Sequence, residues 1–276
     1  MRKKQIVGLG RTAEILAWNK NQVLKLFRDD WSRSAVKWEE KIARMISEAG
    51  LPVPAVYGII EVDGRHGILY EHVDGQSMLD AFLTKPEELE HFAKLFAGLH
   101  VKMHSIRIRG LPFQRQQLEK KIRNARPLSE RSRNAALETL HQLPDDNVLC
   151  HGDFHPDNIL MSSQGPIVID WNDATQGNSY ADIARTLLLL NPPRSLIEEI
   201  LRVQPKAEFD IEQVLSSIKL FTDIYLRQYT QMRSVSLENV KSWQLPVAAA
   251  RLSEGIKEEE SQLLSIVKAL SNAISL

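Results

Sequence analysis

The segment His151–Leu160, HGDFHPDNIL, concentrates side chains that can do chemistry. Asp153 and Asn158 lie five positions apart, and Asp170 follows a short apolar run further along the chain. Phosphoryl transfer that depends on Mg²⁺ uses one carboxylate to orient the attacking hydroxyl and accept its proton. An amide oxygen and a second carboxylate hold Mg²⁺ on the nucleotide phosphates. The spacing therefore favours a phosphoryl-transfer site built from these three residues.

Two other interpretations of this segment compete with phosphoryl transfer. His151 and His155 lie four positions apart, which on a helix would suit a zinc ion. Gly152 and Pro156 disfavour a helix here, and no cysteine or later histidine supplies a third ligand. A merely polar turn explains poorly why Asp170 ends an apolar strand, so phosphoryl transfer remains the favoured hypothesis.

The first forty residues contain groups that could bind a nucleotide. The loop from Gly8 to Thr12 lies between two predicted strands, where backbone N–H groups can cover phosphates, although a plain hairpin turn has the same pattern. Lys25 interrupts an apolar strand. It is either an ordinary surface lysine or a cation for phosphates, held by a carboxylate of the following helix, Glu39 or Glu40.

The elements that must position these residues fall into two groups. Residues 5–28 read as two short strands and 55–71 as a second hairpin. A helix between them starts near Ser32 or Ser34 and ends at Gly50. From residue 89 onward helical spacing dominates, apart from a hairpin at 159–169. We expect helices at 115–142 with a break at Pro127, and at 180–190, 195–203, 209–233 and 246–273. This order predicts an α+β protein.

Composition limits the function classes. Lys+Arg and Asp+Glu both number 35, so no general attraction to nucleic acid is expected. The basic residues between 107 and 133 are interpreted as solvated surface, with attraction of an anionic substrate as the weaker alternative. The longest apolar run, 186–190, is too short for a membrane span. The single cysteine, Cys150, ends an apolar run and predicts a buried thiol in a cytoplasmic protein.

The ordered motifs resemble the aminoglycoside phosphotransferase and choline kinase branch of the protein-kinase-like fold. The resemblance covers roughly residues 5–190, and its most specific part is the His-Gly-Asp loop with the later Ile-Asp. The matching segments are VLKLF around Lys25, WEEKI around Glu39, LPVPAV, YEHVDG, HGDFHPDNIL, VIDWND and ADIA around Asp182. The resemblance implies two lobes: an N-terminal nucleotide-binding lobe, residues 1–72, of antiparallel sheet plus one helix, and a larger, mainly helical catalytic and substrate-binding lobe, residues 73–276.

The resemblance also implies roles for individual residues. Asp153 would be the catalytic base, and Asn158 and Asp170 would hold Mg²⁺. For ATP, the implied contacts are Lys25 paired with Glu39, the loop residues Gly10, Arg11 and Thr12, and the main chain of Glu71 and Val73. Trp171 and Asp173 would line the acceptor site, while His151 and Asp182 would support the catalytic loop structurally.

The implied activity is transfer of the γ-phosphate of ATP to a hydroxyl of a small molecule, without a nucleic-acid or membrane partner. An aminoglycoside acceptor is polycationic and needs a carboxylate-rich pocket. The C-terminal region offers Glu198, Glu199, Glu208, Asp210, Glu212, Glu254, Glu258, Glu259 and Glu260, but an amino alcohol or a sugar is also compatible.

Two other classes of protein stay open. One is a nucleotide-binding regulatory protein with a vestigial kinase site, although none of Lys25, Asp153, Asn158 and Asp170 is missing. The other is a small atypical protein kinase. The twelve positions from Asp170 to Asp182 leave little room for a peptide-docking loop.

Overall fold

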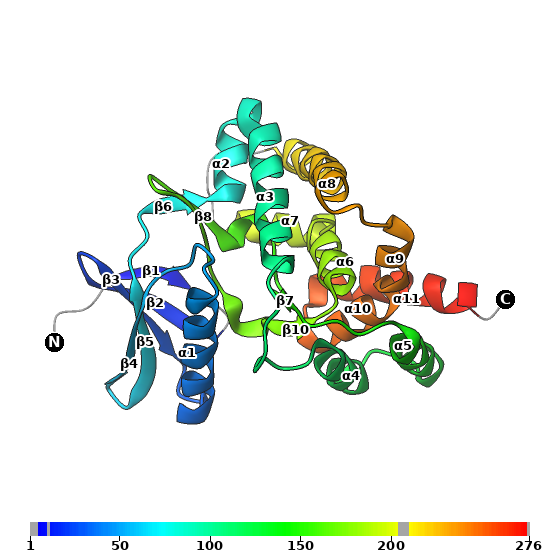
Figure 1. The fold of residues 1–276 in the computed structure, drawn as a ribbon, viewed down its shortest axis with the longest axis horizontal. Coiled ribbons are helices and arrows are strands. Elements are labelled where there is room, and N and C mark those ends of the chain that lie inside the picture. Colours follow the sequence, from blue (N-terminus) through cyan, green and yellow to red (C-terminus); the bar gives the residue numbers. More distant parts are fainter. Residues whose placement is uncertain (1–4, 10–11, 204–209, 275–276) are drawn as a thin grey trace. The chain divides into compact units, whose positions relative to one another are not determined.

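The computed structural model describes residues 5–9, 12–203 and 210–274. It divides into two compact units (Figure 1). Unit 1 consists of Met1–Ala81 with Pro156–Asn172, and unit 2 consists of Phe82–His155 with Asp173–Leu276. The hairpin after the HGDFHPDN segment belongs to unit 1, whereas Asp153 itself belongs to unit 2. The division into a nucleotide-binding lobe 1–72 and a catalytic lobe 73–276 stays a prediction about function.

Unit 1 contains a five-stranded antiparallel sheet with the strand order β1-β2-β3-β5-β4. Its strands are β1 (Ile6–Leu9), β2 (Ala13–Asn19), β3 (Gln22–Phe27), β4 (Val56–Val62) and β5 (Arg65–Glu71). Neighbours in sequence pair through short turns, and β3 pairs with β5. Residues 55–71 form the predicted hairpin, whereas residues 5–28 form three strands instead of the predicted two, because the chain reverses direction between Leu9 and Ala13 as well as after Asn19.

Helix α1 (Arg33–Glu48) covers one face of this sheet (Figure 1). Its N-terminus is capped by Ser32, whose hydroxyl accepts a hydrogen bond from the Ala35 N–H at 3.2 Å. Val36 of α1 packs with Phe27 and Ile68 of the sheet. The opposite face carries a second apolar cluster that includes Leu24 and Leu26. The alternation of β3 thus directs its even-numbered residues to one face and its odd-numbered residues to the other.

A small sheet completes unit 1 and positions the residues after the HGDFHPDN segment. It has the order β6-β8-β9, from β6 (Gly75–Ser77), β8 (Ile159–Ser162) and β9 (Gly165–Val168). The hairpin β8–β9 is the one predicted at 159–169, with Ile159 opposite Val168. The Val168 N–H donates to the Pro52 carbonyl at 2.7 Å, which ties this hairpin to the segment after α1.

Unit 2 is built mainly of helices. It begins at Phe82, within α2 (Met78–Thr84). The helices that follow are α3 (Leu89–His104), α4 (Gln114–Asn124), α5 (Glu130–Gln142), α6 (Ser179–Leu189), α7 (Arg194–Val203), α8 (Ile211–Arg233), α9 (Leu237–Ser242), α10 (Gln244–Arg251) and α11 (Lys257–Ile274). The α+β class, with a sheet-bearing N-terminal part and a helical C-terminal part, is confirmed.

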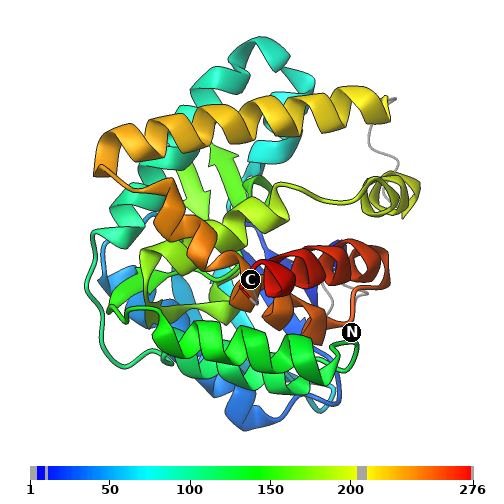
Figure 2. The ribbon, with the colours of Figure 1, turned by 90° about the vertical axis from the view of Figure 1, so that its right-hand side faces the viewer.

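Two sets of helix contacts organise unit 2. The 23-residue helix α8 packs along α3, and Figure 2 shows it as a long straight rod. Phe96 of α3 makes ring contacts with Phe221 and Tyr225 of α8. Helix α10, which is buried along its length, lies against α4, α5, α6 and α11. Helix α6, whose first turn carries Asp182, lies against α10, α9 and β7.

The predicted helix at 246–273 is wrong as a single element. The chain instead forms α10, a 3₁₀ turn at Leu252–Glu254, and α11. Gly255 separates them with φ of +68°, a left-handed conformation that ends a helix and that glycine adopts without steric penalty. This break turns Glu254 away from a continuous helix and into contact with charged side chains of α6 and α10.

Two short strands hold the start of the HGDFHPDN segment. Strand β7 (Val148–Cys150) pairs antiparallel with β10 (Thr175–Gly177), and Cys150 is buried as predicted. In the described part of the chain, no helix combines the length and apolar character that crossing a bilayer requires.

Candidate active site

Lys25 is directed at helix α1 by the alternation of strand β3. Its neighbours Leu24 and Leu26 pack on the other face of the sheet, so Lys25 shares the face that α1 covers. Its Nζ lies 2.8 Å from Glu39 Oε1. Glu40, the alternative partner, instead binds Arg44 one helical turn further along at 2.8 Å. The structure therefore pairs Lys25 with the carboxylate on the inner face of α1.

The ion pair is largely removed from solvent, since the Lys25 and Glu39 side chains are only 15% and 12% exposed. Burial by itself lowers the pKa of Lys25, but the nearby carboxylates of Asp170 and Glu39 outweigh burial and raise that pKa. Burial also raises the pKa of Glu39, more than the charge of Lys25 lowers it. Lys25 is consequently held as a cation at neutral pH.

Asp170 reaches the same lysine from the end of the β8–β9 hairpin. Its Oδ1 lies 3.2 Å from Lys25 Nζ and accepts the Asn172 side-chain amide at 2.6 Å. The Asp170 backbone has φ of +62°, a strained conformation for a non-glycine residue of the kind found at functional sites. The Ile169 N–H donates to the carbonyl of Asn158 at 3.0 Å, which places Asn158 opposite the residue before Asp170.

The other residues expected to bind ATP are placed as follows. Thr12 lies in a bend before β2, and its carbonyl accepts the Arg28 N–H at 3.2 Å. Glu71 ends β5, with its carboxylate accepting the Ala55 N–H at 3.1 Å. Val73 follows in a segment outside any strand. Gly10 and Arg11 lie outside the described residues.

In unit 2, the turn that carries Asp153 depends on a glycine. Gly152 has φ of +80°, and a Cβ there would come within 2.5 Å of the Asp173 carbonyl oxygen. The N–H groups of His151 and Gly152 donate to the two carboxylate oxygens of Asp182, at 2.9 and 2.8 Å. The Asp153 N–H donates to His151 Nδ1 at 3.2 Å. Asp182 and His151 thus fix the turn that presents Asp153.

The Asp153 carboxylate lies among positive and polar groups. Its Oδ1 is 3.3 Å from Arg185 Nη2, and its Oδ2 is 3.5 Å from His155 Nε2. Burial raises the pKa of Asp153, but the hydrogen bond with His155 and the charge of Arg185 outweigh burial and hold that pKa well below its usual range. Asp153 is therefore an anion at neutral pH. Arg185 also donates to the Gly152 carbonyl at 3.0 Å, so it braces the turn as well.

Charged side chains from five elements lie around this turn in unit 2. Glu254 Oε1 lies 2.9 Å from Arg185 Nη2 and 3.6 Å from Lys121 Nζ, and Arg251 contacts its other oxygen. Lys121 also binds Asp173 at 2.8 Å. We call Lys121, Asp173, Arg185, Arg251 and Glu254 the charged network.

Lys121 was expected on a solvated surface; its side chain is 31% exposed, and its ammonium group makes two ion pairs. Trp171, predicted beside Asp173 at the acceptor, is buried in unit 1 and donates its indole N–H to the Val168 carbonyl at 3.2 Å. That Trp171 and Asp173 line the acceptor site stays a prediction.

The comparison with known families decides the assignment. The model of the "phosphotransferase enzyme family" matches residues 10–212, well over half of the chain. The chain belongs to this family. The match spans every predicted site residue, and the prediction of a kinase-type phosphotransferase is thereby confirmed.

Solved structures agree on the fold of this phosphotransferase. Apo aminoglycoside phosphotransferase APH(4)-Ia, a thermostable mutant, has a TM-score of 0.67 at 15% identity, covering 98% of this chain and 94% of that one. The streptomycin–ATP complex of APH(2")-IIa has a TM-score of 0.61 at 16% identity, with 96% and 92% coverage. APH(3'')-Id from Streptomyces rimosus has a TM-score of 0.54 at 17% identity, with 90% and 92% coverage. These likenesses confirm the protein-kinase-like fold.

A curated relative is acyl-CoA dehydrogenase family member 10 of Mus musculus, which is 28% identical over 191 residues. The aligned region is 59% of this phosphotransferase but only 18% of the mouse protein. The chain therefore spans a small part of that relative's length.

Beside the turn that carries Asp153 lies a buried hydrogen-bond network that the sequence analysis missed. Asp182, 1% exposed, also accepts hydrogen bonds from His100 Nε2 at 3.2 Å and His104 Nε2 at 3.1 Å. The other ring nitrogens of these histidines bond the hydroxyls of Tyr225 and Tyr229 on α8, at 2.9 and 2.6 Å. The matching i, i+4 spacing of the two histidines and the two tyrosines was the available sequence signal.

The predicted alternative of zinc at His151 and His155 is not supported. His151 Nδ1 accepts the Asp153 N–H, so this nitrogen is already used. Among the described residues, the three groups close enough to share an ion are His100, His104 and Asp182. Their nitrogen–oxygen distances are those of hydrogen bonds, and Asp182 also accepts two backbone N–H groups. We interpret them as a structural hydrogen-bond network.

The hydrogen-bond network of His100, His104 and Asp182 predicts that the fold loses stability in acid. Burial and the neighbouring His104 lower the pKa of His100 to about 3, from an ordinary 6.5. Below about pH 6.5 the unfolded chain therefore binds a proton that the folded chain refuses, and Asp182, with its lowered pKa, acts in the same direction. The free energy of unfolding should fall as pH drops from about 6.5 toward 3, with His100 alone contributing about 1.4 kcal/mol per pH unit.

Urea unfolding between pH 7 and pH 4 measures this slope. His100→Asn should show a shallower pH dependence than the wild type, and His91→Asn, which alters an exposed histidine of the same helix, should retain the wild-type slope. Equal slopes for wild type and His100→Asn would show that His100 is not held neutral in the fold.

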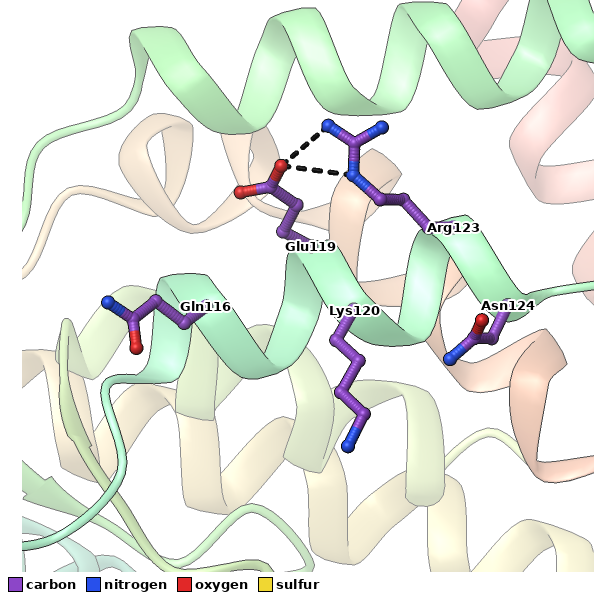
Figure 3. A pocket seen from close by; sticks show the side chains of 5 residues that line it. All are labelled: Gln116, Glu119, Lys120, Arg123 and Asn124. Carbon is purple, nitrogen blue, oxygen red and sulfur yellow. Dashed lines mark hydrogen bonds and ion pairs between the residues drawn. The ribbon is translucent and has the colours of Figure 1, made fainter.

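A surface hollow of about 290 Å³ lies beside α4 and is separate from the predicted site residues. It is lined by Gln116, Glu119, Lys120, Arg123 and Asn124 (Figure 3). Glu119 binds Arg123 at 2.6 Å, and Lys120 points away from this pair.

Proposed function

We propose that this phosphotransferase moves the γ-phosphate of ATP to a hydroxyl of a small molecule in a reaction that depends on Mg²⁺. One observation carries the proposal. The Lys25 ammonium group lies 3.2 Å from Asp170, and Asp170 follows the residue whose N–H binds the Asn158 carbonyl. A cation suited to phosphates and a carboxylate suited to a divalent ion are therefore close together at one end of the β8–β9 hairpin, and the backbone of Asn158 pairs with the residue before that carboxylate.

The donor set fits Mg²⁺. Asp170 offers a carboxylate that is 44% exposed, and Asn158 offers an amide oxygen, which are the hard oxygen ligands that this ion prefers. Two protein ligands are few, and Mg²⁺ commonly completes its shell with water and phosphate oxygens. When bound with ATP, the ion would neutralise charge on the phosphates.

The nucleotide contacts that we propose are those that the family resemblance implies. In our proposal Lys25, kept charged by Glu39, binds the phosphates. Gly10, Arg11 and Thr12 cover them, and the main chain of Glu71 and Val73 meets the adenine.

Asp153 is proposed as the group that receives the acceptor's proton. The acceptor oxygen forms a bond to the γ-phosphorus as the bond to the leaving ADP breaks, and the hydroxyl proton passes to the Asp153 carboxylate. The low pKa of Asp153 keeps it ionised and therefore able to orient the hydroxyl by accepting its hydrogen bond. His155 and Arg185, on either side of the carboxylate, fix its direction.

An acceptor screen separates this proposal from a regulatory protein or a protein kinase. Purified protein is incubated with ATP, Mg²⁺ and a set of hydroxylated small molecules, and acceptor-dependent ADP release is measured beside a peptide mixture. Release with a small molecule supports the proposal. Nucleotide binding without release on any acceptor would favour a regulatory protein, and release only with peptides would favour a protein kinase.

Asp170→Ala should remove the Mg²⁺-dependent part of ATP affinity. Loss of a metal ligand is expected to weaken ATP binding in Mg²⁺ by about 100-fold or more, while binding in EDTA changes little. Titration calorimetry with ATP in Mg²⁺ and in EDTA measures both quantities. The control is Asp157→Ala, which removes an exposed carboxylate from the same unit. Unchanged affinity of Asp170→Ala in Mg²⁺ would contradict the metal role.

A further inference from the structure

The carboxylates that could make a polycation pocket in unit 2 are largely neutralised by the protein itself. Glu254, only 13% exposed, contacts Arg185, Arg251 and Lys121. Glu259 is buried against Arg251, with oxygen–nitrogen distances of 2.6 and 2.7 Å. The remaining carboxylate of the charged network, Asp173, binds Lys121.

The other described acidic residues that were expected to attract a cation form ion pairs with arginines or lie at helix N-termini. Glu198 and Glu212 both bind Arg194, and Glu199 binds Arg202. Asp210 caps α8 by accepting the Gln213 N–H. Glu258 and Glu260 are exposed in the first turn of α11, where their negative charges interact favourably with the helix dipole. Glu208 lies outside the described residues. Among the described acids of this group, Glu198, Glu199 and Glu212 are thus neutralised by arginines, whereas Asp210, Glu258 and Glu260 lie at the N-termini of α8 and α11.

A polycationic acceptor would have to compete with these internal cations. Arg185 and Arg251 are buried, so an amine that took Glu254 from them would remove one of the two carboxylates that each contacts, leaving Asp153 for Arg185 and Glu259 for Arg251. Hydroxyl groups fit better, because each one both donates and accepts a hydrogen bond. Paired guanidinium, ammonium and carboxylate groups present donors and acceptors side by side in fixed directions.

We infer that the acceptor of this phosphotransferase is an uncharged polyhydroxy compound, of the sugar or polyol class, recognised through the charged network. The inference rests on the proposed function, because it names the acceptor of the same site. In this inference Lys121 is the specificity-determining residue: it is half-buried on α4, and it neutralises both Asp173 and Glu254.

The first test compares matched acceptors. ADP release is measured with neutral monosaccharides and polyols, each beside its amino analogue, such as glucose with glucosamine, and with the polycation streptomycin. The neutral member of a pair should have the larger kcat/KM, and that value should change little between 50 and 300 mM salt. A streptomycin kcat/KM at or above that of every neutral acceptor would overturn the inference while leaving the proposed function intact.

The second test alters the internal cation. Lys121→Met leaves Asp173 without its ammonium partner and reduces the positive charge at Glu254, so the glucosamine-to-glucose ratio of kcat/KM should rise by about tenfold. Lys120→Met is the matched control, because it removes the same charge from the next residue, which is exposed beside the hollow of Figure 3. This control should keep the wild-type ratio. A ratio unchanged by Lys121→Met, or changed equally by both variants, would overturn the inference.

A measurement of nucleotide binding distinguishes failure of the inferred acceptor class from failure of the proposed function. Calorimetry with ATP and Mg²⁺ is run on the same preparations. Intact binding with no phosphorylation of any neutral acceptor overturns the inferred acceptor class. Absent binding overturns the proposed function, and the inference with it.

Discussion

Asp153→Asn should lower kcat for the phosphorylated acceptor by about 10²- to 10⁴-fold, the usual contribution of a positioned general base. The amide cannot take the hydroxyl proton, and it also removes the negative charge that Arg185 and His155 hold in place. ATP affinity should change little, because Lys25 and Asp170 are untouched. Steady-state kinetics with the acceptor found in the screen gives kcat, and calorimetry gives the ATP affinity.

Asp157→Asn is the control for this substitution. It makes the same chemical change at an exposed position in the same HGDFHPDN segment, and it should leave kcat within about twofold of wild type. Turnover of Asp153→Asn at the wild-type rate would remove Asp153 from the mechanism and would leave the phosphotransferase without its proposed base.

Asp182→Ala should destabilise the fold by about 3–5 kcal/mol, which is a large part of the stability of an ordinary domain. The substitution leaves His100, His104 and two backbone N–H groups buried without their common acceptor. Because those N–H groups belong to His151 and Gly152, the turn that presents Asp153 should also lose its support. Urea unfolding measures the loss of stability, and kcat measured well below the unfolding midpoint reports the turn.

Asp223→Ala is a suitable comparison for Asp182→Ala. Asp223 is exposed on α8, so its removal should change the free energy of unfolding by less than about 0.5 kcal/mol. If Asp182→Ala were as stable as Asp223→Ala, the hydrogen bonds of Asp182 would be replaced by others in the variant, and its supporting role would be lost.

Local sequence patterns predicted the elements that carry the proposed site residues. The β8–β9 hairpin was expected because two apolar runs flank a short polar turn, and Asp170 follows its second strand directly. The pairing of Lys25 with a carboxylate of α1 was expected too, but the sequence alone left two candidates. Adjacent residues of a helix point in different directions, so only the docking of α1 on the sheet directs Glu39 to Lys25 and Glu40 to Arg44.

The sequence was least informative where contacts join distant segments of unit 2. Arg185 and Glu254 are 69 positions apart, and neither lies in a motif with a spacing that predicts the pair. Gly255 was read as part of a continuous helix because its neighbours on both sides have helical spacing. Its left-handed φ, which ends that helix, depends on how α10 and α11 pack.

The sequence by itself predicted the α+β class from the order of its elements. It predicted the phosphotransferase chemistry and the residues proposed for it because a short loop and a hairpin carry them at characteristic spacings. Only the tertiary structure decided which charges surround Asp153, which groups support its turn, and how the C-terminal acids are neutralised. The physical reason is that an ion pair or a buried hydrogen bond depends on distance and burial in space. The charged side chains of α4, α6 and the turn at Leu252–Glu254 come close together and become buried only when the helices pack.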